Sequence, residues 1–334
     1  MNERSKFSSS RSSHIVAVVA LIGGCGAPLR QARTSSDQPD REREVDSETR
    51  LGRAPCGGGW SVLFPGAGQL CTGKTGAGAT LMALGAAELA TGIAVASTSP
   101  EGVEHPGAAV PFIGFQDLWV YGIADFVLDR QRAARLPYVP EETLVELAVA
   151  PFNPKVLKQP DVWAGIVGLT AAGVGLSLLA GEHLRTGRFG QSPNLFGREL
   201  RPGVGYPLAA LVGTALFEQV AIAEETAFRG YIQSDLTRRT NPTTGWLVGS
   251  LIFGATHALN ALVLPGDQQA RYLAVAVPGI TLVGSYLGLS YRWHGYSLAP
   301  PVALHFWYDF LLSAVFFAAD PQHSPLSASV AMPF

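Results

Sequence analysis

Two adjacent glutamates and an arginine stand at the end of a long apolar run. The sequence AIAEETAFRGY overlaps and extends the apolar residues 204–223, and charged groups at such a place mark a functional site by default. On a helix, Glu225 and Arg229 are four residues apart and can pair on one face. Glu224 is turned about 100° away and lacks that partner. We therefore predict that the pair supports the helix and that Glu224 is free to act as a base.

Two further polar clusters lie inside apolar runs. Phe253 and His257 are four residues apart, so the Phe253 ring can pack against the His257 imidazole. Asn260, three residues after His257, can hydrogen-bond the same imidazole. His305 and Asp309 have the same spacing and face the same way. Hydrogen bonds between membrane helices average only about 0.6 kcal/mol, so helix packing alone explains three such clusters poorly. The spacing predicts that a glutamate, two histidines and an aspartate meet in one pocket.

The elements that must position these residues are long apolar segments. The chain has 334 residues, of which 47% are hydrophobic and 15% charged, with a mean hydropathy of +0.21. A helix needs about 20 apolar residues to cross the hydrocarbon core, so we predict an all-α, polytopic membrane helical bundle of about seven to eight transmembrane helices. The expected full spans are residues 77–96, 110–128, 161–180, 204–223, 243–264, 272–291 and 298–319.

Residues 1–25 have the features of a secretory signal. Basic residues precede a short apolar stretch, which ends in LIGGC and resembles a bacterial lipobox with Cys25 as the lipidated residue. The alternative is an uncleaved N-terminal anchor. Residues 26–59 are polar, rich in both charges and unable to bury a core, so we predict a disordered tether. The lipobox indicates a bacterium, so together with the apolar spans it predicts a multi-pass protein of a bacterial cell membrane.

Residues 60–135 are predicted to form a membrane hairpin domain. The stretch PGAGQLCTGK resembles the P-G-x-G-Q-x-Y-x-G-K pattern of small bacterial membrane-hairpin domains. It lacks the strand and helix context of a nucleotide-binding loop, so we expect no nucleotide. Asp117 and Asp125 should face protein or water rather than lipid. Residues 136–160 are expected to form a cytoplasmic or interfacial loop.

The three motifs, taken in order, resemble the CPBP family of CAAX prenyl endopeptidases and bacteriocin-processing proteins, which includes abortive-infection-like membrane proteins. The resemblance rests on EExxxR from Glu224, FxxxH from Phe253 and HxxxD from His305. Many members end in HxxxN, a position at which this chain has an aspartate. The resemblance covers about residues 161–319, the predicted protease core, and residues 320–334 form a tail.

The resemblance implies an intramembrane endopeptidase of the glutamate type, acting on a membrane-embedded or membrane-proximal peptide or protein in the lipid bilayer. Glu224 and His257 would activate the attacking water. His305 and Asp309 would stabilise the developing oxyanion, with the anionic Asp309 orienting His305. The supporting residues would be Glu225, Arg229, Phe253 and Asn260.

Alternatives to this mechanism stay open. Glu224, His257, His305 and Asp309 are all legitimate zinc ligands, so metal-assisted hydrolysis is an alternative, although no H-E-x-x-H is present and we favour no cofactor. A non-catalytic membrane scaffold or immunity protein with the same fold is another. The net charge of −2 gives no reason to expect nucleic acid as a partner.

Overall fold

The computed structural model describes residues 59–179 and 188–322, all within one compact unit, Ala54–Phe334. The predicted signal sequence with Cys25, nearly all of the predicted tether and most of the predicted tail lie outside the described residues.

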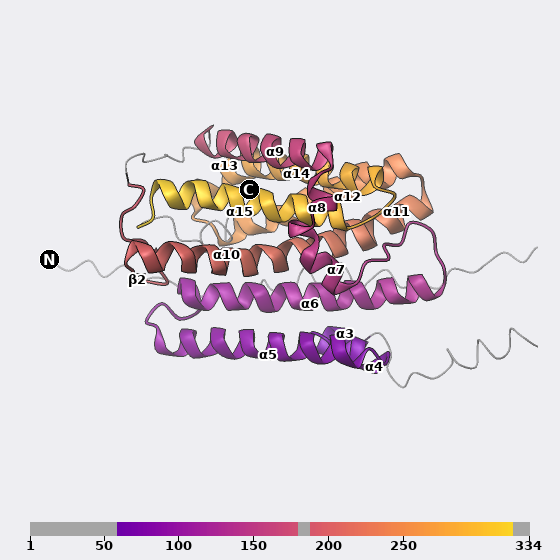
Figure 1. The fold of residues 1–334 in the computed structure, drawn as a ribbon, viewed down its shortest axis with the longest axis horizontal. Helices are drawn as coiled ribbons and strands as arrows, with labels where there is room; N and C mark the ends of the chain where they lie inside the picture. Colours follow the sequence, from indigo (N-terminus) through magenta and orange to yellow (C-terminus); the bar gives the residue numbers. More distant parts are fainter. Residues whose placement is uncertain (1–58, 180–187, 323–334) are drawn as a thin grey trace, which may run out of the picture. The chain divides into compact units, whose positions relative to one another are not determined.

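Long helices make up most of the described chain, which confirms the predicted all-α class (Figure 1). They are α5 (Thr75–Thr98), α6 (Pro106–Ala133), α9 (Pro160–Leu179), α10 (Pro202–Glu224), α12 (Pro242–His257), α14 (Val277–Trp293) and α15 (Ala299–Ala319). Short α-helices are α3 (Gly59–Leu63), α4 (Ala67–Cys71), α7 (Leu144–Val149), α8 (Pro154–Leu157), α11 (Ser234–Arg239) and α13 (Gly266–Arg271).

The remaining elements are short and of three kinds. The 3₁₀ helices are η1 (Gly102–Glu104), η2 (Ala150–Phe152) and η4 (Ala258–Val263), and the π-helical segments are η3 (Glu225–Gln233) and η5 (Tyr272–Ala276). The strands β1 (Asn194–Leu195) and β2 (Arg198–Glu199) form an antiparallel hairpin, with Asn194 opposite Glu199 and Leu195 opposite Arg198.

Six helices in the described part of the chain are long and apolar enough to cross a membrane. The predicted count of about seven to eight is therefore not confirmed. The predicted span 110–128 has no counterpart among these six helices. It lies in α6, which carries three aspartates, Asp117, Asp125 and Asp129. It packs between α5 and α10 (Figure 1), so protein rather than lipid surrounds its acids. Asp117 and Asp125 are buried, as predicted.

An apolar core lies between α9, α14 and α15. The buried residues Val162 and Ile166 of α9 belong to the same cluster as Val283 and Leu287 of α14 and Leu304 of α15. Leu304 directly precedes one of the predicted site histidines, so this packing fixes the position of α15 along its neighbours.

The glycine-rich motif before α5 forms a tight turn that docks on α6. Gly66 has a φ of 83°, and a Cβ there would lie 2.3 Å from the carbonyl oxygen of Gly78, so only glycine fits. The fully buried Gln69 donates to the carbonyl of Gly122 at 2.9 Å and to Asp125 at 3.2 Å. The glycine and the glutamine of this motif thus have a structural role in helix docking.

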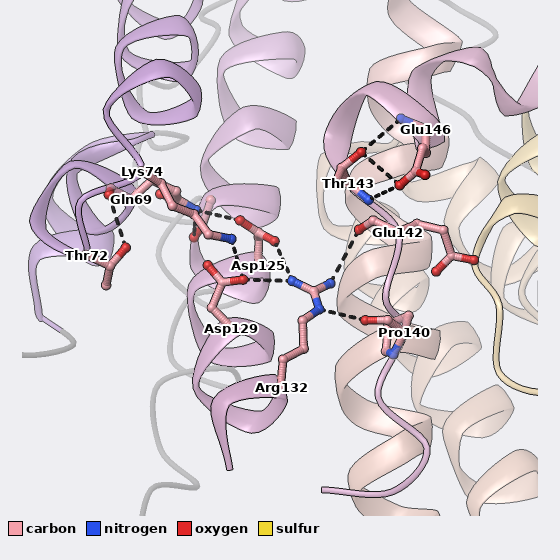
Figure 2. Close-up of polar contacts among 11 residues, drawn as sticks. Gln69, Thr72, Lys74, Asp125, Asp129, Arg132, Pro140, Glu142, Thr143 and Glu146 are labelled. Carbon is pink, nitrogen blue, oxygen red and sulfur yellow. Dashed lines mark hydrogen bonds and ion pairs between the residues drawn. The ribbon is translucent and has the colours of Figure 1, made fainter. Parts of the chain in front are cut away.

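Arg132, near the end of α6, connects this hairpin to the following loop (Figure 2). Its Nη1 contacts Asp125 at 3.2 Å and Asp129 at 2.8 Å, and its Nε donates to the carbonyl of Pro140 at 2.7 Å. Further along the loop, the Glu142 carboxylate accepts from the backbone N–H of Leu298 at 3.1 Å, at the start of α15. The hairpin and the helix that carries the HxxxD motif are therefore linked by polar contacts.

A capping box begins α7 in the same loop. Thr143 accepts from the backbone N–H of Glu146, and the Glu146 carboxylate accepts from the backbone N–H and the hydroxyl of Thr143 (Figure 2). These hydrogen bonds lower the pKa of the exposed Glu146 carboxyl, because they favour its charged form. This part of the predicted cytoplasmic or interfacial loop is thus a short, capped helix.

Candidate active site

The two glutamates lie at a change of helix type. The α-helix α10 ends at Glu224, and the chain continues into the π-helical segment η3 from Glu225 and then into α11. π-helical turns are uncommon and often occur at functional sites. Our prediction assumed α-helical spacing throughout, and nothing in the residue pattern signalled the change.

Glu225 is fully buried and contacts two basic side chains. Its Oε1 accepts from Nη1 of Arg229 at 2.9 Å and lies 2.8 Å from Nδ1 of His305. Arg229 is also buried, and its Nη2 donates to the carbonyl of Gly284 at 2.8 Å. The predicted Glu225–Arg229 pair is confirmed. The sequence did not predict that the same carboxylate also holds the site histidine on α15.

His305 is positioned by carboxylates on both sides of its ring. Its Nδ1 faces Glu225, whereas its Nε2 lies 3.3 Å from Oδ2 of Asp309 and 3.8 Å from Oε2 of Glu224. An imidazolium carries a proton on each nitrogen and can donate to both Glu225 and Asp309. The predicted contact between Asp309 and His305 is confirmed.

The hydrogen bonding of His257 defines which ring nitrogen faces the pocket. Its Nδ1 lies 2.8 Å from the backbone carbonyl oxygen of Phe253. A carbonyl oxygen only accepts, so Nδ1 must be the donor. The neutral ring therefore has its lone pair on Nε2, which lies 3.8 Å from Oε1 of Glu224. His257 thus directs a proton acceptor at the carboxylate of Glu224.

Phe253 contacts several of the site residues through its ring. The His257 ring lies 4.5 Å away between centroids, which confirms that Phe253 backs the imidazole, and the His305 ring lies at 6.3 Å. The guanidinium of Arg229 lies 4.2 Å from the ring centroid, and Phe228 packs edge-on at 5.0 Å. A cation over an aromatic face is stabilised by the ring quadrupole. Phe253 therefore holds α12 against η3.

Gly284 allows this close approach from α14, and a methyl group there should disturb it. A Cβ would lie 2.5 Å from the Phe253 ring and 3.2 Å from Nη2 of Arg229. We expect Gly284→Ala to lower the free energy of unfolding by about 1–3 kcal/mol, measured by thermal unfolding in detergent. Gly168→Ala on α9, where a Cβ meets nothing within 4 Å, is the matched control and should change little. Equal stability of the two variants would contradict this packing.

The predicted hydrogen bond between Asn260 and the His257 imidazole is replaced by a different contact. The Asn260 amide donates to the hydroxyl of Tyr272 at 3.2 Å, and that hydroxyl donates to the backbone carbonyl of His257 at 3.2 Å. The α-helix ends at His257 and residues 258–263 continue as 3₁₀ helix, so α-helical side-chain directions do not apply beyond it. Asn260 supports the end of α12 through Tyr272, which the sequence analysis did not identify.

The four predicted site residues come together, with Glu224 in contact with both histidines and Asp309 beside His305. Glu224 is the most accessible, with 22% of its side chain exposed, against 13% for Asp309, 7% for His257 and 6% for His305. Within residues 59–179 and 188–322, no three His, Cys, Asp or Glu side chains are grouped in the manner of a metal site. The catalytic roles and the need for a metal stay predictions.

A further acidic residue near this group was not included among the predicted site residues. Asp117 of α6 is buried, and its carboxyl group interacts electrostatically with Glu224 and His305. Its position in a predicted span marked it as facing protein, but only the packing of α6 against α10 shows which residues it approaches.

Residues 206–311 match the family model described as type II CAAX prenyl endopeptidase Rce1-like. This confirms the predicted resemblance over a narrower segment than the predicted core, and the segment contains all three motifs. No curated protein and no solved structure gives a match. The family match implies a membrane protease, and together with the six apolar helices it indicates a multi-pass membrane protein in a lipid bilayer.

Proposed function

We propose that this protein is an intramembrane endopeptidase that hydrolyses a peptide bond in a membrane-embedded or membrane-proximal peptide. The observation that carries the proposal is the position of the Glu224 carboxylate. Its two oxygens face His257 and His305, which come from two other helices, each at 3.8 Å. The family match over residues 206–311 supports the same chemistry.

Glu224 and His257 are suited to activating water. A distance of 3.8 Å between Oε1 and Nε2 is too long for a direct hydrogen bond and suits a bridging water. The carboxylate and the unprotonated nitrogen both accept, so such a water directs both hydrogens at them and its lone pairs elsewhere. Glu224 takes the proton as the water oxygen attacks the carbonyl carbon, and it then returns the proton to the leaving nitrogen.

His305 and Asp309 are suited to stabilising the oxyanion that forms on the attacked carbonyl. A cationic donor held in a site of low dielectric stabilises developing negative charge without reorganisation. Glu225 and Asp309 hold the His305 ring from both sides at 2.8 and 3.3 Å. The anionic Asp309 cannot donate to the oxyanion, so its contribution is to orient and charge His305.

The family description names prenyl endopeptidases, but the proposal for this chain covers membrane peptides more broadly. Its test compares the membrane proteome of cells that produce the wild-type protein with that of cells that produce Glu224→Gln. We expect uncleaved species to accumulate only with the variant. Identical proteomes would contradict a protease.

Two variants on different helices distinguish a protease from a non-catalytic scaffold. A scaffold needs the fold and not the reacting groups, so Glu224→Gln and His257→Ala would both keep the full biological effect in the host. A protease loses that effect with either variant, provided that both proteins reach wild-type levels in the membrane.

Metal dependence is tested by exhaustive chelation with the metal content measured. We favour the mechanism without metal, and we expect the purified protein to keep full activity at substoichiometric metal. The alternative is zinc held by Glu224, His257, His305 and Asp309, in which case activity falls in proportion to the zinc removed and returns when zinc is added. That second result would replace water activation by Glu224 with activation by a metal.

A further inference from the structure

Asp117 lies on α6, outside the matched residues 206–311, and α6 packs against both α10 and η3, which carry Glu224 and Glu225. The Asp117 side chain is buried, with a relative exposure of 6%, and its Oδ2 has no hydrogen-bond partner among the described residues. Its carboxyl group interacts electrostatically with Glu224, with Glu88 of α5 and with His305 of α15. The hairpin α5–α6 therefore brings acidic groups to a site built by the other helices.

Glu88 occupies the same interface. Its Oε1 accepts from Nε2 of Gln219 on α10 at 2.9 Å, and its buried Oε2 has no partner in the described part of the chain. A Cβ on Gly114 would lie 2.5 Å from Oε1 of Glu88 and 2.6 Å from Oε1 of Gln219. Both side chains therefore rest on the backbone of α6 one helical turn before Asp117. The two acids lie where α5, α6 and α10 pack together, and Gln219 is five residues before Glu224 on α10.

Within the described residues, neither Asp117 nor Glu88 forms an ion pair with a lysine or arginine, although Asp117 also interacts with His305. Arg229 is engaged by Glu225 and the Gly284 carbonyl, and His305 is engaged by Glu225 and Asp309. A buried carboxylate without a counter-charge, such as Asp117, destabilises a protein unless a proton or a bound cation neutralises it. Such a pair next to a catalytic group is suited to a cationic ligand.

We propose that Asp117 and Glu88 form an acidic subsite beside Glu224 that binds a lysine or arginine side chain of the substrate. The inference rests on the proposed function and specifies its substrate class. Lysine and arginine flank membrane segments on their cytoplasmic side, so a membrane-proximal substrate presents them close to the bilayer. Their donors match carboxylate oxygens that the protein itself leaves unpaired.

The experiment first maps cleavage sites that depend on Glu224 in the membrane proteome. We expect lysine or arginine to be enriched at one position near the scissile bond. A peptide from one such substrate is then compared with its Lys→Met form on the purified protein in lipid nanodiscs. Asp117→Asn should lower kcat/KM for the lysine peptide about 30-fold, mainly through KM, and should change the methionine peptide little. Asp117→Glu should keep part of the preference.

The control is Glu218→Gln, which removes a partly buried carboxyl group from α10 that forms no hydrogen bond or ion pair with the residues that the structure describes. It should keep the lysine preference, and all variants should unfold at similar temperatures. Equal loss for both peptides with Asp117→Asn would show a proton-holding or structural role and would overturn the subsite. Cleavage sites that depend on Glu224 without basic enrichment would also overturn it. The absence of any such sites would overturn the proposed function itself.

Discussion

Glu224→Gln should lower the rate of peptide hydrolysis by about 10²–10⁴-fold, the typical contribution of a general base. The substitution keeps the shape of the side chain but removes its ability to take a proton from water. Glu224 is also the most accessible member of the group, with contacts to both histidines at 3.8 Å. The measurement is kcat on a membrane peptide with the purified protein in nanodiscs.

The control for this variant is the same substitution at another position of the same helix. Glu218→Gln lies on α10, six residues before Glu224, and should leave kcat within about twofold, because surface and partly buried changes away from the site have small effects. Similar activity of Glu224→Gln and the wild type would show that this carboxylate is not the base.

Arg229→Ala should cause the largest loss of stability. Arg229 and Glu225 are 2% and 0% exposed, and removing the arginine leaves Glu225 as a buried charge without its main partner. Breaking a buried ion pair in this way lowers the free energy of unfolding by about 3–5 kcal/mol. The measurement is thermal unfolding in detergent. Activity should fall as well, because Glu225 also holds His305.

An exposed ion pair in the next helix provides the comparison. Arg239 contacts Asp235 at 2.6 Å, but the arginine is 49% exposed, so Arg239→Ala should change the free energy of unfolding by about 0–1 kcal/mol. If Arg229→Ala and Arg239→Ala shifted the unfolding temperature equally, the buried pair would not have the structural role that we assign to it.

The sequence predicted that the four site residues meet, and it predicted individual contacts only where they depend on one helix. Glu225–Arg229, Phe253–His257 and His305–Asp309 are each four residues apart, and helix geometry fixes which side chains can meet at that spacing. These contacts form even where the helix changes to π type, as η3 does. The hydrogen bond of Asn260 was predicted wrongly, because the helix around it changes to 3₁₀.

Contacts between helices could not be read from the residue pattern. The pairing of Glu225 with His305 joins residues 80 positions apart, and that of Arg229 with the Gly284 carbonyl joins residues 55 apart. Both depend on the rotation and offset of packed helices, which a helical repeat does not specify. The same holds for Asp117, whose neighbours follow from the packing of α6 between α5 and α10.

The number of membrane spans was also difficult to predict from the sequence. Residues 110–128 are apolar enough to be read as a span, but the helix that contains them is longer and carries several acids. Protein contacts on both sides accommodate those acids (Figure 1). Hydropathy alone does not distinguish a helix that faces lipid from one that is enclosed by its neighbours.

The central claim is that Glu224 directs water at a peptide bond within the membrane. The most direct test incubates the purified protein in nanodiscs with a membrane peptide in water enriched in ¹⁸O and analyses the new C-terminus by mass spectrometry. We expect one ¹⁸O atom in the new carboxylate with the wild-type protein and no new terminus with folded Glu224→Gln. A labelled terminus formed at the wild-type rate by Glu224→Gln would contradict the claim.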